Sequence, residues 1–164
     1  MREGDPVSGA GHVLARVRTG QIRPEDVRAA ALVGVAEARE AFPDEPRSTD
    51  LEPPAIAEAL GAYGVAPSVT VILVVVDHIL SVPDRSMYRD EVPLRRTRHA
   101  ALEWFQCQCD AHMSELETVL EEAWGTTTPE EASVWAAQAA RDVSSDEMIR
   151  KVLVDGFRAR LLGS

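Results

Sequence analysis

The sequence predicts an all-α protein of eight or nine short helices, and three observations lead to this prediction. Apolar residues recur at helical spacing in most segments, as they do between Met113 and Ala123. Proline and glycine divide the 164 residues into pieces of about helix length. Hydrophobic residues make up 45% of the chain but aromatic residues only 5%, so the core has to be built mainly from Ala, Val and Leu. Such small side chains favour close helix packing, in a bundle or a stacked helical array.

In the first half of the chain, four short helices are expected within one domain that spans residues 1–164. Pro24 suits the first position of a helix, and Glu25 and Asp26 are favourable in its first turn. Residues 1–7 are expected to be flexible, and the proline- and acid-rich stretch 43–54 is expected to be a loop. The expected helices are residues 8–18, 24–34, 35–42 and 55–63.

The segment from Val69 to Leu80 is the one ambiguous element. Its β-branched residues favour a strand, whereas its length of about a dozen residues favours a helix. A single strand would have nothing to pair with, because no second strand-like run occurs in the chain. The segment is therefore predicted to be a buried central helix around which the other helices pack.

The second half carries clearer signals. A polar loop is expected over residues 83–92. Pro93 begins the next helix, which carries Trp104 and Phe105 near its end, and residues 110–124 form the helix after it. Thr128 and Pro129 are expected to cap and start a helix that runs to Val143. The last helix begins near Ser145 and presents Ile149, Leu153, Gly156 and Phe157 on one face.

Composition excludes several classes of function. The formal net charge of −10 argues against sequence-independent binding to nucleic acid or to an anionic membrane, and it would suit a basic partner protein. The longest apolar run is too short to span a membrane, and the N-terminal residues lack the apolar core of a signal peptide. Two cysteines separated by one residue are a poor disulfide framework, so a reducing cytoplasm is the expected location. No cofactor is expected.

The stretch WFQCQCDAH (104–112) holds both cysteines and a histidine, and three interpretations are open. Thiolate and imidazole are zinc ligands, so it could be a metal site. On a continuous helix, however, the side chains of Cys107 and Cys109 would point about 200° apart. The pair could also be redox-active, or one cysteine could be a small buried side chain at a helix junction. The candidate metal ligands are Cys107, Cys109, His112 and His99, with Glu103 or Asp110 as further options for a fourth ligand.

The helix junction is the interpretation that the pattern favours, with no metal bound. The apolar stripes before and after the cysteines can face one core only if two antiparallel helices meet here. We therefore expect a turn between Gln106 and Asp110, with Asp110 as the N-cap of the next helix and His112 in its first turn. Trp104 and Phe105 are expected to be buried.

Catalysis is not expected. Cys109 and His112 offer a thiol and a base, but no glycine-rich turn provides an oxyanion hole. The neighbouring Asp77 and His78 could form a buried acid–base pair, although such pairs more often face a polar neighbour or solvent. We accordingly expect no enzyme and no catalytic residue.

Two charged clusters are candidates for binding a partner protein. Three arginines in the first turn of a helix oppose its dipole, so acids elsewhere are expected to hold them, among them Glu91, Asp90 and the 43–52 segment. An internal salt-bridge patch is the simpler interpretation, and a partner site is the alternative. The candidate partner-binding residues are Asp44, Glu45, Arg47, Asp50, Glu52, Arg95, Arg96 and Arg98.

The order of elements resembles a loosely defined group of bacterial all-α proteins labelled as immunity proteins. The likeness rests on RAAALVGVAEA (28–38), the Pro- and Asp-rich loop, and a pattern that joins Arg96, Ala100, Trp104 and C-x-C-x-x-H at 107–112. It implies a small cytoplasmic binding protein that neutralises a toxin, without catalytic residues. The alternatives are an adaptor or effector subunit of a larger bacterial assembly and, from another class, a zinc-dependent regulator or hydrolase that uses Cys109 and His112.

Overall fold

The computed structural model describes residues 9–47, 50–82 and 91–163, and within these ranges it contains nine α-helices, one short 3₁₀ helix and no strand. The predicted all-α fold is confirmed. The elements are α1 (Gly9–Arg18), α2 (Pro24–Val33), α3 (Ala36–Ala41), α4 (Pro53–Leu60), η1 (Gly61–Tyr63), α5 (Val65–Ser81), α6 (Val92–Cys107), α7 (Asp110–Trp124), α8 (Pro129–Ala140) and α9 (Asp146–Leu162).

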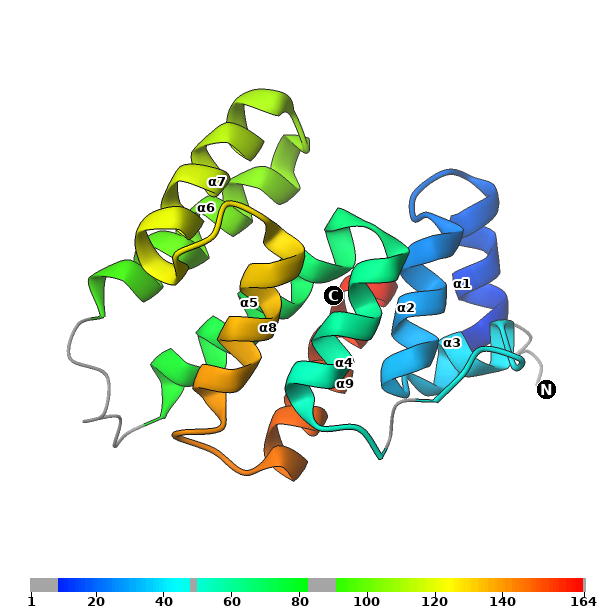
Figure 1. Ribbon diagram of the computed structural model, residues 1–164. Helices are drawn as coiled ribbons and strands as arrows, with labels where there is room; N and C mark the ends of the chain where they lie inside the picture. The colour runs from blue at the N-terminus through cyan, green and yellow to red at the C-terminus, as the bar shows by residue number, and fades with distance from the viewer. Residues whose placement is uncertain (1–8, 48–49, 83–90, 164) are drawn as a thin grey trace.

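The helices form a row, with α5 near its middle (Figure 1). The hairpin of α6 and α7 stands at one end of this row, and α1, α2 and α3 stand at the other. Helix α5 packs against α6, α8 and α9, while α4 packs against α8 and α2 packs against α9 and α3. Segments far apart in the sequence therefore share one core, because the last two helices return to fill the centre of the row.

The central helix α5 is longer than the predicted segment 69–80, extending from Val65 to Ser81. Buried side chains lie on every side of its first half, over residues 67–72, whereas from Leu73 onward they lie on one side and Asp77 and Ser81 are exposed. The unbroken run of buried residues in the first half hides the helical periodicity there. Thr70 fits this apolar setting because its Oγ1 donates a hydrogen bond to the carbonyl of Ala66 at 2.9 Å. The helix prediction for this element is confirmed.

Two predictions about where an element ends need correction. The expected loop 43–54 ends two residues early, because Pro53 already occupies the first turn of α4, where a missing N–H is harmless. Helix α8 ends at Ala140 rather than Val143, and turns occupy the residues that follow. Residues 1–7 and most of the predicted loop 83–92 lie outside the described part of the chain.

The predicted helix caps differ in outcome. The Ser145 side chain accepts a hydrogen bond from the backbone N–H of Met148 at 3.1 Å, as expected of an N-cap at the start of α9. Thr128 is the N-cap residue of α8, but its side chain makes no capping bond. The Thr126 hydroxyl instead accepts from the backbone N–H of Thr128 at 3.2 Å.

The core is built from small aliphatic residues, as the composition predicts. Ala29, Ala31, Ala57, Ala101 and Ala136 are fully buried, and buried Val, Leu and Ile side chains fill the remaining space. Within the described ranges, the structure contains no helix that combines the length and the apolar character needed to cross a membrane.

Candidate functional site

A sharp turn joins α6 to α7 and creates the candidate site. Helix α6 ends at Cys107, and Gln108 then adopts the left-handed conformation (φ 51°, ψ 34°), which is uncommon for a residue with a side chain. The backbone N–H of Gln108 donates to the carbonyl of Trp104 at 2.6 Å and closes the last turn of α6. The predicted break between Gln106 and Asp110 is confirmed, although Cys109 rather than Asp110 is the N-cap residue of α7.

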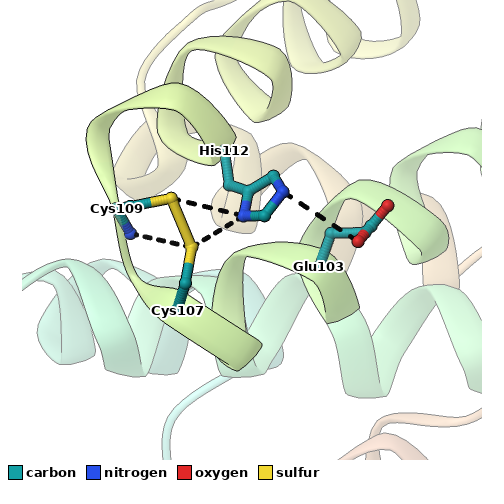
Figure 2. The surroundings of a disulfide bond; sticks show 4 residues. All are labelled: Glu103, Cys107, Cys109 and His112. Carbon is teal, nitrogen blue, oxygen red and sulfur yellow. Dashed lines mark hydrogen bonds and ion pairs between the residues drawn. A yellow bond between two sulfur atoms is a disulfide. The ribbon is translucent and has the colours of Figure 1, made fainter.

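This turn brings both sulfur atoms to one side of the chain, where a disulfide joins Cys107 to Cys109 (Figure 2). We expected cysteines in this spacing to be a poor disulfide framework, and this expectation is wrong. On a continuous helix the two sulfurs would point apart, but the turn at Gln108 brings them together. The Nδ1 atom of His112, in the first turn of α7, lies 2.7 Å from Cys107 Sγ and 3.3 Å from Cys109 Sγ. Two sulfurs and one ring nitrogen thus meet at a single point.

A carboxylate stands on the other side of the His112 ring. Glu103 of α6 places its Oε2 4.0 Å from His112 Nε2, and its Oε1 lies 3.1 Å from Nε2 of His99 (Figure 2 shows the first of these contacts). The carboxylate therefore lies on the Nε2 side of the ring, beyond hydrogen-bond distance, while Nδ1 is the ring nitrogen that faces the sulfurs. His99 therefore reaches the site only through Glu103, and the structure does not place it among the candidate ligands.

Neither cysteine is a buried core side chain, which corrects the favoured junction interpretation. Cys107 is exposed, and Cys109 and His112 are only half-buried. The apolar contacts of the junction come from Trp104, which is buried as predicted, and from Phe105, which is only partly buried. Packing therefore does not explain why cysteine occupies these two positions.

The arginine cluster at the start of α6 is held by acids of the same chain. Arg95 pairs with Glu91 at 2.7 Å, as predicted. Arg96 pairs with Glu122 of α7 at 2.8 Å, and Arg98 pairs with Asp77 of α5 at 2.8 Å, so the 43–52 segment supplies none of these partners. These contacts match the simpler interpretation of an internal salt-bridge patch; Asp90 lies outside the described residues.

The acidic loop also makes contacts within the chain. Glu45 accepts a hydrogen bond from the Tyr63 hydroxyl at 2.6 Å, and this contact, after burial, raises the pKa of Tyr63 to about 12. Glu52 pairs at 3.2 Å with Arg141, whose guanidinium also binds Asp146. Asp44, Arg47 and Asp50 are exposed. Seven of the eight partner-binding candidates are therefore exposed, and Glu45 alone among them is partly buried.

Asp77 and His78 do not act as a pair. Asp77 faces Arg98, whereas His78 Nε2 lies 3.0 Å from the Ser144 hydroxyl, and burial lowers the pKa of the His78 imidazole. The adjacent positions point to different neighbours because successive residues of a helix do not face each other. The structure therefore does not assemble the acid–base pair that the sequence left open.

A cavity that the sequence analysis missed lies behind the turn. It has a volume of about 170 Å³ between α1, α2, α5 and α9, and Arg16, Asp26, Phe105 and Arg160 line it. The Arg160 guanidinium stacks 3.5 Å from the centre of the Phe105 ring, and burial raises the pKa of the Asp26 carboxyl. No sequence pattern indicates this cavity, because its lining comes from five separate segments of the chain.

No family model matches the chain, and neither the curated proteins nor the solved structures include a significant match. The resemblance to immunity proteins therefore stays a prediction, and the candidate function has to be argued from the residues themselves.

Proposed function

We propose that this protein is a non-enzymatic thiol-redox protein, in which Cys107 and Cys109 interconvert between a dithiol and a disulfide. One observation carries the proposal: the two sulfurs are joined at an exposed turn, and a ring nitrogen lies against both of them. Reactive cysteines are typically accessible and close to a histidine, whereas structural cysteines are typically buried and inert.

A structural role for the disulfide has little physical basis. The bond joins residues that are two positions apart, so it closes a very small loop. Because the stabilisation by a disulfide grows with the length of the loop that it closes, the gain lies well below the ~3 kcal/mol expected for a fifteen-residue loop. The two ends of this turn are also fixed already by the packing of α6 against α7. The exposed position of Cys107 instead supports attack by a thiol from solution.

The proposed reaction is exchange with a low-molecular-weight disulfide such as oxidised glutathione. The Cys107 thiolate attacks one sulfur of the small disulfide, whose S–S bond breaks and releases one thiolate. The Cys109 thiolate then attacks Cys107 Sγ in the mixed disulfide and releases the second. The protein gives up two protons and two electrons, and one small disulfide becomes two thiols. In a reducing cytoplasm, the location that we propose, the dithiol would be the resting form.

His112 is proposed to assist this exchange. Its Nδ1 atom can accept a thiol proton from either sulfur, and the resulting imidazolium would stabilise a neighbouring thiolate. Glu103 would in turn hold the imidazolium through Nε2, at the 4.0 Å separation of the two atoms. The site thus provides a nucleophile, a base and a group that orients the base.

We expect the native protein to lose both thiols together when it is equilibrated with increasing ratios of oxidised to reduced glutathione. The reason is that Cys109 is adjacent to any mixed disulfide formed at Cys107 and resolves it. Alkylation followed by intact mass measurement counts the thiols at each ratio. His112→Ala is expected to slow the exchange by about tenfold or more, because general-base assistance is lost.

His12→Ala is the matched control, since His12 is exposed on α1 and contacts neither the sulfurs nor Glu103 among the described contacts. It is expected to leave the exchange rate within about twofold of the wild-type rate. Thiols that stay reduced at every glutathione ratio would overturn the proposal, as would a disulfide that survives excess dithiothreitol in native buffer. Equal exchange rates in the His112→Ala and His12→Ala variants would show that His112 does not assist the exchange.

A second candidate function is binding of a partner protein, and one observation favours it. Trp135 on α8 has 52% of its surface exposed, whereas Trp104 is buried and Trp124 donates a hydrogen bond from Nε1 to the Thr97 hydroxyl at 3.3 Å. Exposed tryptophans are often the residues that anchor an interface. The net charge of −10 would suit a basic partner, such as the toxin that the resemblance implies.

We expect Trp135→Ala to remove a partner that the wild-type protein retains when both are used as bait in the native host. An interface tryptophan typically contributes about 2 kcal/mol or more, which corresponds to roughly a thirtyfold loss of affinity. Lys151→Ala is the control, because the Lys151 side chain is exposed on α9, pairs with Asp155 of the same helix and is not among the candidate partner-binding residues. Identical sets of bound proteins for wild type and Trp135→Ala would exclude Trp135 as an anchor.

A further inference from the structure

We infer that the dithiol form of the same site binds a zinc ion through Cys107 Sγ, Cys109 Sγ and His112 Nδ1. The three side chains each offer one ligand atom, and these atoms lie within 4.8 Å of one another. The inference rests on the proposed function in one respect: both thiols must be accessible to reduction. It goes further by naming the ion that the reduced pair would hold.

The backbone of the turn is what makes chelation by adjacent cysteines possible. In a continuous helix, two residues that are two positions apart point in nearly opposite directions and cannot share an ion. The left-handed Gln108 reverses the chain between them, so that both sulfurs face the His112 ring. Two thiolates of one tetrahedral zinc lie about 3.8 Å apart, given Zn–S bonds of about 2.3 Å. Reduction, which breaks the S–S bond, lets the sulfurs separate toward that spacing.

The surroundings of the imidazole also match a metal ligand. A histidine that binds zinc through one ring nitrogen commonly donates its other N–H to a carboxylate, which fixes the ring and its proton. Here Nδ1 faces the sulfurs, and Nε2 faces Glu103 Oε2 at 4.0 Å. Glu103 is further held by His99 through its other oxygen at 3.1 Å. The Glu103 carboxylate thus lies behind the His112 ring, on the side away from the point where the two sulfurs and Nδ1 converge.

The donor set selects the class of ion. Two thiolates and one imidazole suit zinc, whereas magnesium and calcium prefer oxygen ligands. Three protein ligands leave the fourth tetrahedral position to water or to a donor from a binding partner, which the exposure of Cys107 permits. Zinc and the disulfide compete for the same two sulfurs, because only thiolates bind the ion. Oxidation of the pair by a small disulfide would therefore release the zinc.

The test uses Co²⁺ as a spectroscopic substitute for zinc, added to tag-free, fully reduced protein without oxygen. We expect one Co²⁺ per chain, with the visible bands of tetrahedral cobalt and a thiolate charge-transfer band, and displacement of both by one equivalent of Zn²⁺. Cys107→Ser, Cys109→Ser and His112→Ala are each expected to weaken binding at least a hundredfold. Glu103→Gln is expected to weaken it by about 10–100-fold, as for other carboxylates behind a ligand histidine.

His12→Ala serves as the control variant, because His12 is exposed on α1 and should leave the affinity unchanged. Far-UV circular dichroism shows whether each variant folds, and the oxidised wild-type protein provides a test without any substitution, since it should bind no cobalt. Thiol titration of the same sample separates the two proposals. Two titratable thiols without cobalt bands would overturn the zinc site while leaving the redox pair intact. Unchanged affinity in His112→Ala or Cys109→Ser would also overturn it.

Discussion

Replacing Ile72 by alanine is expected to lower the free energy of unfolding by about 3–5 kcal/mol, in the upper part of the range for such substitutions. Ile72 is fully buried in α5, the helix that packs against α6, α8 and α9. Removing three carbon atoms from a position enclosed by several helices leaves a cavity that the neighbours cannot readily close. Urea unfolding monitored by circular dichroism measures the change.

Leu102→Ala is the matched control for this substitution. Leu102 lies on α6 with 37% of its surface exposed, so the same kind of truncation removes much less buried contact. Its expected cost is about 1 kcal/mol or less. Equal losses for the two variants would contradict the central position that the structure assigns to α5.

The helical structure of α5 could be predicted because a single strand would have had no partner, even though the residues of α5 favour a strand. Val69, Val71, Ile72, Val75 and Val76 would all suit a β-sheet, and all five are buried in the helix. The unbroken run of buried residues over 67–72 hides the periodic pattern that usually identifies a helix, so the length of the segment and the lack of a second strand decided the prediction. The start of α5 was predicted four residues too late, because Gly64 is its N-cap residue and Pro67 lies in its first turn, where a proline is tolerated.

The geometry of the cysteine site could not be predicted from its residue types. Glutamine is not a helix breaker, and the sequence did not show that Gln108 would adopt the left-handed conformation. The need for two antiparallel helices located the turn within four residues, but whether the sulfurs met or diverged depended on a single pair of backbone angles. The contact between Glu103 and His112 followed from the same turn, because it brings the end of α6 beside the start of α7.

The partners of the arginine cluster show a related limit. Glu91 could be predicted because it lies four residues before Arg95 at the start of the same helix. Glu122 and Asp77 could not, since their distances from Arg96 and Arg98 depend on how α7 and α5 pack against α6. Local electrostatics indicated that the arginines needed acids, but tertiary packing selected which acids.

Gly156→Ala is expected to lower the free energy of unfolding by about 1–2 kcal/mol, although alanine is the better helix former. Gly156 lies within α9, and a Cβ atom there would overlap Val74 Cγ2 and stand 3.0 Å from Val74 Cγ1. Valine is stiff about χ1, so it cannot rotate away without strain, and overpacking typically costs about 1–3 kcal/mol. The gain in helix propensity, about 1 kcal/mol, offsets only part of this cost.

A double-mutant cycle with Val74→Ala tests this cause directly, with urea unfolding as the measurement. Once Val74 is truncated, the added methyl group has space, and Gly156→Ala should become neutral or stabilising. Gly61→Ala is the control, because a Cβ atom at that position meets Glu130 at an ordinary 3.5 Å and the backbone is already right-handed helical. It should leave stability unchanged or raise it slightly. If Gly156→Ala cost nothing in the wild-type background, or cost the same with and without Val74, the close contact between α5 and α9 would not be the reason for glycine at this position.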